Sequence, residues 1–239
     1  MEPVRALIFD MDGTLLHTMP DLAAAANEAL SRMGFPTRTQ DEMLASMGYG
    51  GRWLIEQIVP EDATDEQCRQ TFELWRELYI GSDYALTEPF EGVVGTLQQL
   101  QQNGVKLGVL SNKFDAGVRA LAKRHFPGLF DAVQGDAPPL PRKPDPTTLL
   151  QMLEALGVRS EEAAYVGDSQ VDVQVARNAG VQAIGVSWGY DQAAPPPIDE
   201  LDAYIHEPGE LLALAQKQPK GDTPLWAKTR RQHEGTATA

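Results

Sequence analysis

The chain has a single cysteine, few aromatic residues and a shortage of positive charge. Among its 239 residues, Cys68 is the one cysteine, 7% are aromatic, and 20 Lys and Arg stand against 34 Asp and Glu, for a net charge of −14. One cysteine excludes an internal disulfide framework and favours a reducing compartment. The negative charge argues against nucleic acid and anionic membranes as partners. It does not exclude phosphorylated substrates, because a metal ion and a few lysines can reverse the local field.

Long apolar runs are also lacking. No stretch reaches the length that crosses a membrane, and the opening residues show no cationic segment followed by a long apolar one. We therefore expect a cytoplasmic protein without a membrane partner. The hydrophobic fraction of 42% and the charged fraction of 23% are typical of a folded globular chain. The length suits one large domain or a domain with an insert.

The most informative stretch lies near the start. Ala6–Phe9 is an apolar run of strand length, and Asp10, Asp12 and Gly13 follow it at once. Side chains at i and i+2 of an extended chain point the same way, so the two carboxylates can meet at the end of a buried strand. Such a pair needs a cation or a proton. An acidic turn is the plain alternative, whereas a calcium loop is excluded because Leu15 stands where that loop needs glycine.

Residues 17–84 predict an all-helical segment that interrupts the rest of the chain. Pro20 and Asp21 are typical of a first helical turn, and apolar residues recur at helical spacing up to Met33. We expect further helices over Thr39–Ser46, Gly51–Val59 and Thr64–Gly81. No convincing strand is present in this segment. An insert directly after the first strand is where a lid over an active site would lie.

One loop of this segment is a candidate anion site. Gly48–Gly51, which includes Gly50, precedes an expected helix whose free N–H groups could receive an anion, and Arg52 could add a charge-assisted bond. The alternative is a tight turn between helices beside a solvated arginine.

From Phe90 onwards short strands alternate with helices of about a dozen residues, a pattern that predicts a parallel sheet with helices on both faces. The expected strands are Val105–Leu110, Ala132–Gln134, Ala163–Val166, Gln182–Ser187 and Ala203–Ile205; the expected helices are Val93–Gln102, Phe114–His125, Pro146–Leu156, Val171–Ala179 and Glu207–Gln216. The fold class is therefore α/β, with a Rossmann-like core and a small all-helical cap domain inserted after the first strand. We expect the core to span 1–16 and 85–216, the cap 17–84, and a mobile tail 217–239.

In such sheets ligands bind beyond the carboxyl ends of the strands, so the polar residues there should meet. In addition to Asp10 and Asp12, the polar residues expected at the strand ends are Ser111, Asn112, Lys143, Asp168 and Asp172. Ser111 can hold a phosphate oxygen at a helix start or simply cap that helix. Lys143, fixed in an extended backbone by the next proline, can supply a point charge or be an ordinary surface lysine. Asp168 and Asp172 lie four apart and can share a helix face. A helix cap would explain either acid alone, but it explains Asp172 less well because Asp172 stands a full turn into the helix.

Together these elements resemble a known family. Asp-x-Asp-Gly-Thr-Leu over 10–15, Ser111-Asn112, Lys143-Pro144-Asp145-Pro146 and Gly167-Asp168-Ser-x-x-Asp172 occur in the order of the four motifs of the haloacid-dehalogenase-like (HAD) phosphohydrolases. The resemblance covers about residues 4–215. It implies a helical cap and a Mg²⁺-dependent phosphatase that acts on a small phosphorylated metabolite.

The same resemblance implies a role for each matching residue. Asp10 would be the nucleophile that forms an aspartyl phosphate, and Asp12 the general acid and base. Mg²⁺ would be held by Asp10, the backbone carbonyl of Asp12 and Asp168, with Asp172 orienting the ligands or the lysine. The phosphate-binding residues implied by the resemblance are Ser111, Asn112 and Lys143.

Two stretches are similar to the phosphoglycolate phosphatase branch of that family: Pro20-Asp21-Leu22-Ala23-Ala24-Ala25 and Met47–Ile55. This similarity implies a small phosphorylated acid such as 2-phosphoglycolate as the substrate, with Gly50 and Arg52 in its cap site. His17-Thr18 departs from the Asp-Ser that relatives commonly carry there.

Other functions remain open at this point. A sugar phosphomutase of the same fold would use the same residues. A non-enzymatic signalling module that accepts phosphate beside Mg²⁺ would also combine acids, a hydroxyl and a lysine, although such modules are about half this length. A dehalogenase is disfavoured because it has no need of Asp12. Whether the protein is a monomer or a homodimer is left open by the sequence.

Overall fold

A six-stranded parallel sheet forms the centre of the molecule, in the order β5-β4-β1-β6-β7-β8. The computed structural model describes residues 4–44, 46–47, 49–190, 196 and 198–215. The strands are β1 (Ala6–Phe9), β4 (Lys106–Phe114), β5 (Ala132–Asp136), β6 (Ala163–Gly167), β7 (Gln182–Val186) and β8 (Ala203–Ile205). Because β1 lies between β4 and β6, the residues at its carboxyl end are flanked by those at the carboxyl ends of its two neighbours.

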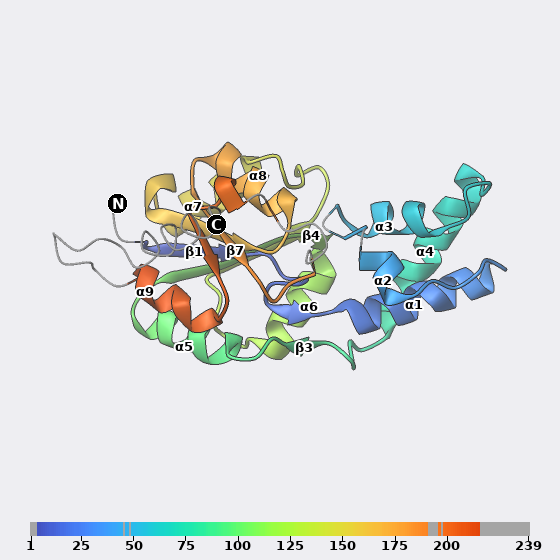
Figure 1. The fold of residues 1–239 in the computed structure, drawn as a ribbon, viewed down its shortest axis with the longest axis horizontal. Coiled ribbons are helices and arrows are strands. Elements are labelled where there is room, and N and C mark those ends of the chain that lie inside the picture. The colour runs from blue at the N-terminus through green and yellow to red at the C-terminus, as the bar shows by residue number, and fades with distance from the viewer. Residues whose placement is uncertain (1–3, 45, 48, 191–195, 197, 216–239) are drawn as a thin grey trace, which may run out of the picture.

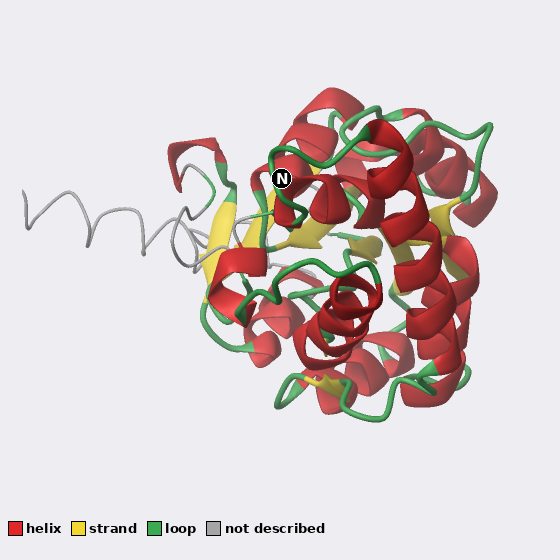
Figure 2. Ribbon diagram, turned by 90° about the vertical axis from the view of Figure 1, so that its right-hand side faces the viewer, coloured by secondary structure: helices red, strands yellow, loops and turns green. Residues whose placement is uncertain are grey.

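Helices cover both faces of the sheet (Figures 1 and 2). They are α5 (Val93–Gln102), α6 (Asp115–His125) and α9 (Leu211–Ala215) on one face, and α7 (Thr147–Leu156) and α8 (Gln170–Ala179) on the other. The alternation along β1 produces this arrangement: Leu7 and Phe9 pack into the first layer, whereas Ala6 and Ile8 pack into the second. The predicted fold class is confirmed.

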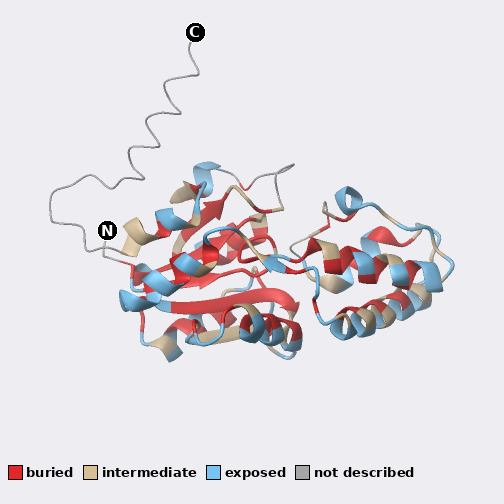
Figure 3. Ribbon diagram, turned by 90° about the horizontal axis from the view of Figure 1, so that it is seen from below, coloured by how far each residue is buried: buried red, intermediate tan, exposed pale blue. Residues whose placement is uncertain are grey.

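Four helices follow the first strand and form a separate layer at one end of the sheet (Figure 1). They are α1 (Met19–Arg32), α2 (Gln40–Leu44), α3 (Gly51–Ile58) and α4 (Asp65–Gly81). They pack on one another, with buried inner faces and exposed outer ones (Figure 3). α4 starts at a capping box in which Thr64 and Gln67 bond each other's backbone N–H. The inserted helical segment is thus as predicted, whereas the domain boundaries stay a prediction.

Several details differ from the sequence-based expectations. A two-stranded antiparallel ribbon, β2 (Leu16–His17) with β3 (Glu88–Pro89), joins the ends of the helical segment where no strand was predicted. β4 continues to Phe114 and so includes Ser111, which was expected to follow the strand. The final predicted helix, Glu207–Gln216, begins as a short 3₁₀ turn, η3 (Pro208–Glu210), and continues as the five-residue α9.

Two further short elements are the 3₁₀ turns η1 (Ser160–Glu162) and η2 (Ile198–Glu200). The predicted tail, 217–239, lies outside the described residues. Across the described part of the chain, every helix is too short or too polar to cross a lipid bilayer.

Candidate active site

The carboxyl ends of β1, β4 and β6 bring together residues that the sequence had singled out separately. Their backbones converge because β1 pairs with both β4 and β6, Phe9 standing opposite Val109 on one side and Val166 on the other. The side chains are almost fully buried. These are Asp10 after β1, Ser111 and Asn112 within β4, Lys143 in the loop before α7, Asp168 after β6 and Asp172 in the first turn of α8.

Lys143 is held at both ends. Its ammonium Nζ lies 2.7 Å from Asp172 Oδ1, 2.9 Å from Tyr165 Oη and 3.1 Å from Asp10 Oδ1. Its backbone is fixed by the side-chain amide of Asn112, which donates to the Lys143 carbonyl at 3.0 Å and accepts from its N–H at 2.9 Å. The lysine is therefore a positioned charge rather than a solvated surface group.

Asp172 serves two purposes. One oxygen accepts from Lys143, while Oδ2 accepts from the backbone N–H of Ser169 at 3.0 Å and from its hydroxyl at 2.7 Å, which completes a capping box at the start of α8. The expectation that Asp168 and Asp172 share a helix face is wrong, because the helix begins only at Gln170. Asp172, not Asp168, takes part in the cap.

Three carboxylates crowd one buried spot. Oxygens of Asp10, Asp168 and Asp172 all lie within 4.8 Å of one another. Burial raises the pKa of Asp10 to about 6, against the opposing effect of Lys143, and burial together with the other acids raises the pKa of Asp168 well above its ordinary value. Burial by itself would lower the pKa of Lys143, but the ion pairs with Asp10 and Asp172 outweigh it and raise that pKa well above its ordinary value. In the part of the chain that the structure describes, three carboxylates therefore share a single ammonium, that of Lys143, and the cluster has more acidic than basic groups.

The cluster fits a divalent cation. Asp10 Oδ1 is buried and accepts no hydrogen bond from the described residues, although the ammonium of Lys143 lies 3.1 Å away. Two glycines leave room around Asp168: a Cβ on Gly13 would collide with its Oδ2, and one on Gly189 would collide with its Cβ. Carboxylate oxygens around such a space are the donors that Mg²⁺ prefers.

The carboxylate of Asp168 is oriented by two donors. The hydroxyl of Thr14 donates to Oδ1 at 2.9 Å, and the backbone N–H of Tyr190 donates to Oδ2 at 2.8 Å. Bonds of this kind fix the direction in which a carboxylate presents its free lone pairs to a metal.

Asp12 is bound by a lysine that the sequence analysis missed. Lys113 Nζ lies 2.9 Å and 3.2 Å from the two carboxylate oxygens of Asp12, and its side chain is 3% exposed. The same ammonium sits 4.5 Å from the ring centroid of Tyr79 on α4. The one signal available in the sequence was the position of Lys113 directly after Ser111-Asn112, at what proves to be the end of β4.

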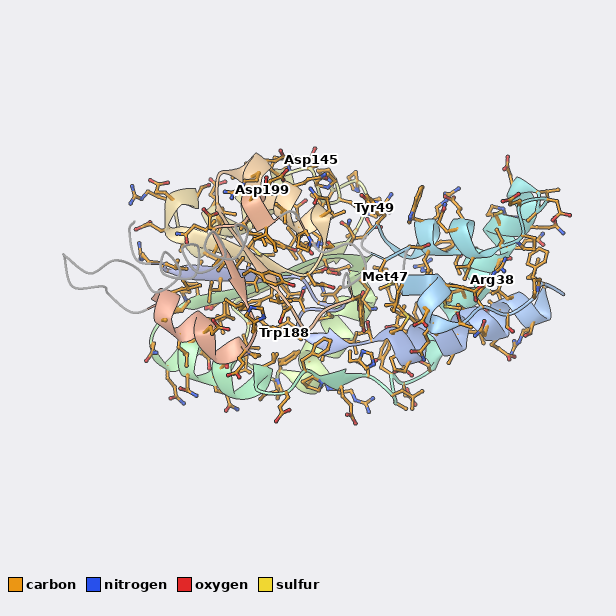
Figure 4. All side chains as sticks on the ribbon, in the orientation of Figure 1. Arg38, Met47, Tyr49, Asp145, Trp188 and Asp199 are labelled. Atoms are coloured by element: carbon orange, nitrogen blue, oxygen red, sulfur yellow. The ribbon has the colours of Figure 1, made fainter. Side chains whose placement is uncertain are left out.

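A cavity of about 900 Å³ opens above these groups, between the sheet and the helical segment. Gly50 lines it and has a φ of +92°, and a Cβ there would lie 3.1 Å from the carbonyl oxygen of Asn112, so the loop closely approaches β4. Arg52 is not among the lining residues: it is exposed, and its Nε pairs with Glu56 at 2.9 Å. Figure 4 shows the cavity-lining Met47 and Tyr49 of this loop where the helical segment faces the sheet.

Comparison with known proteins agrees with this geometry. Residues 7–186 match the model of the haloacid dehalogenase-like hydrolases. The chain belongs to this family. It is 34% identical to phosphoglycolate phosphatase 1 of Pseudomonas aeruginosa, over 89% of this chain and 80% of that protein, and 32% identical to the phosphoglycolate phosphatase of Pseudomonas putida, over 91% and 86%.

Solved structures show the same family likeness. A candidate phosphoglycolate phosphatase from Lactobacillus delbrueckii subsp. bulgaricus superposes with a TM-score of 0.81 at 28% identity, over 90% of this chain and 100% of that chain. The four sequence motifs of this haloacid dehalogenase-like hydrolase therefore lie in a fold that is shared with a solved member of the same kind.

Proposed function

We propose that this hydrolase is a Mg²⁺-dependent phosphatase that cleaves small phosphate monoesters through an aspartyl-phosphate intermediate, with 2-phosphoglycolate as the best substrate. The observation that carries the proposal is the position of Asp10, whose buried carboxylate lines the cavity between Lys143 and the space beside Asp168. The similarity to relatives named phosphoglycolate phosphatase supports the choice of substrate.

The phosphoryl group would be bound by residues of β4 and of the loop before α7 that carries Lys143. The hydroxyl of Ser111 and the ammonium of Lys143 offer donors to phosphoryl oxygens beside Asp10. Asn112 acts by positioning, because its amide is bonded to the backbone of Lys143. A magnesium ion held by Asp10, Asp168 and the backbone carbonyl of Asp12 would supply positive charge to the nucleophile and to the phosphoryl oxygens. With all four aspartates ionised, two lysines and one divalent ion would leave the site neutral, and a proton on Asp12 would give it a charge of +1 toward the phosphoryl group.

The chemistry then divides between two aspartates. A carboxylate oxygen of Asp10 bonds to phosphorus as the bond from phosphorus to the leaving oxygen breaks, and Asp12 gives that oxygen a proton. In the second step Asp12 takes a proton from water, whose oxygen bonds to phosphorus and releases Asp10 and inorganic phosphate. Lys113 beside Asp12 is suited to stabilise the carboxylate form between the steps.

A screen of phosphate monoesters with and without Mg²⁺ tests the proposal. We expect release of inorganic phosphate that stops with a chelator, and a higher kcat/KM for 2-phosphoglycolate than for sugar phosphates. Phosphate released in equal amount to the ester consumed excludes a mutase, which would yield an isomer instead. Asp10→Asn should lose activity by several orders of magnitude while its circular dichroism spectrum stays unchanged. Near-normal turnover by that variant would refute the covalent scheme.

A further inference from the structure

Two buried hydrogen-bond donors on one face of α4 have no partner within the described part of the chain. The indole N–H of Trp75 and the hydroxyl of Tyr79 are buried and bond to nothing among the described residues. The two residues lie four apart on the helix, and their rings stack with centroids 5.6 Å apart and planes 4° from parallel. Trp75 lines the cavity, whereas Tyr79 is fully buried and is not among the lining residues. Buried donors without an acceptor are rare in native proteins, so a ligand atom in the cavity is the natural partner for the indole N–H of Trp75.

A positive charge lies against the same pair. The ammonium of Lys113 is 4.5 Å from the ring centroid of Tyr79, and Lys113 also lines the cavity. Among the described lining residues it is the only lysine or arginine. The two oxygens of Asp12 occupy at most two of its three N–H donors. A donor therefore remains for a ligand beside Trp75 and Tyr79.

The chemistry of this corner favours an anion. Burial and the nearby carboxylate of Asp12 raise the pKa of Tyr79 well above its ordinary value, so Tyr79 adds no negative charge to this corner. The other acids that line the described part of the cavity are Asp10, Asp41 and Asp168, and none of them has the ion pair with Lys113 that Asp12 has. Arg52 cannot compensate from its exposed position beside Glu56.

We propose that Lys113 and Trp75, with the ring of Tyr79 packed against both, form a binding site for a carboxylate on the leaving group of the substrate. The position of the ester rests on the proposed function, in which Asp12 faces the leaving oxygen. Because Lys113 Nζ lies 2.9 Å from a carboxylate oxygen of Asp12, its ammonium lies beside the leaving group rather than beside the phosphoryl group. This site selects phosphorylated acids over phosphorylated alcohols of the same size.

The test compares two esters that differ only in this group. They are 2-phosphoglycolate, which carries a carboxylate, and 2-hydroxyethyl phosphate, which carries a neutral CH₂OH in its place. The readout is the ratio of kcat/KM for the acid to kcat/KM for the alcohol, because any loss through Asp12 affects both esters alike and cancels. We expect the ratio to fall about 10-fold to 100-fold in Lys113→Met, and about 5-fold in Trp75→Phe, which replaces the indole by a phenyl ring and so deletes the N–H. Tyr79→Phe keeps the ring and removes only the hydroxyl, so its ratio should stay within about 2-fold of the wild-type value.

Lys106→Met is the matched control, since Lys106 lies on the same strand and pairs with an aspartate, Asp131, at 2.8 Å, but is exposed. Its ratio should stay at the wild-type value. Dissociation constants of the two esters for Asp10→Asn protein, with and without Lys113→Met, give the same ratio independently of turnover. If the ratio is unchanged in both Lys113→Met and Trp75→Phe, the proposed carboxylate-binding site is refuted. This holds even if the wild type is an active phosphatase. A wild type that cleaves no ester refutes the proposed function, and the binding ratio still decides the site.

Discussion

The buried acids make a prediction about how stability depends on pH and metal. Burial raises the pKa of Asp10 from 3.8 to about 6. Between these values the folded protein holds a proton that the unfolded chain has released, so stability falls as pH rises from about 4 to about 6 and the loss is complete above that range. The full loss is about 2 pKa units, or on the order of 3 kcal/mol. Asp168 contributes in the same direction.

The assay is thermal unfolding of metal-free protein at pH 7.5 and pH 5, with Asp10→Asn as the comparison. At pH 5 about half of the loss is recovered, roughly 1.4 kcal/mol, which for a chain of this size corresponds to a Tm higher by about 3–5 °C. Groups far from Asp10 titrate alike in both proteins, whereas the pKa of Asp168 is raised less in the variant because the charge of Asp10 is gone, which adds to the difference. The Tm of the wild type relative to that of the variant should therefore rise by about this amount on acidification.

A second, independent test repeats the unfolding measurement with added Mg²⁺. The ion binds the ionised carboxylates and stabilises only the folded state, so it should raise the Tm of the wild type more at pH 7.5 than at pH 5. In Asp10→Asn the gain should be smaller at both values. The reasoning is refuted if the two proteins keep a constant difference in Tm across this pH range, or if Mg²⁺ stabilises the wild type equally at both.

Three substitutions test other parts of the structure. Gly13→Ala should lower Mg²⁺ affinity about 10-fold to 100-fold by calorimetry, because its Cβ would collide with Asp168 Oδ2; unchanged affinity would exclude the collision. Thr64→Ala should lower the Tm by about 2–4 °C through loss of the α4 cap and leave kcat unchanged, and an equal Tm would show that the cap contributes nothing. Tyr190→Phe should lower the Tm by about 4 °C, since two N–H groups at the start of α1 lose their acceptor; a Tm equal to that of the wild type would show that water replaces the hydroxyl.

The parts of the site that the sequence could predict are those set by local pattern. The apolar run before Asp10 predicts a buried strand, and the ends of buried parallel strands meet at one edge of the sheet. That rule was enough to bring Asp10, Ser111, Lys143 and Asp168 together without knowing any distance. Strand and helix boundaries were less certain, as β4 shows by continuing through Ser111 to Phe114.

The parts that could not be predicted depend on contacts between distant residues. Lys113 and Asp12 are 101 positions apart, and nothing near either residue indicates the other. β2 and β3 have two residues each and pair across the whole helical segment, so neither has a pattern of its own. Arg52 illustrates the opposite case: a partner one helical turn away, Glu56, binds the side chain that the sequence analysis had placed near the ligand.

Tyr190 shows how such a distant contact joins the helical segment to the site. Its backbone N–H orients Asp168, while its hydroxyl oxygen accepts from the N–H groups of Thr18 at 2.6 Å and Met19 at 2.8 Å. With its oxygen so engaged, the hydroxyl proton is free to bond His17 Nδ1, 3.2 Å away, when that ring carries its own proton on Nε2. The histidine that departs from the family pattern thus has a partner in this chain. Because Tyr190 bonds both to the start of α1 and to the carboxylate of Asp168, a shift of α1 that displaces Tyr190 would also displace a hydrogen-bond donor of the acidic cluster.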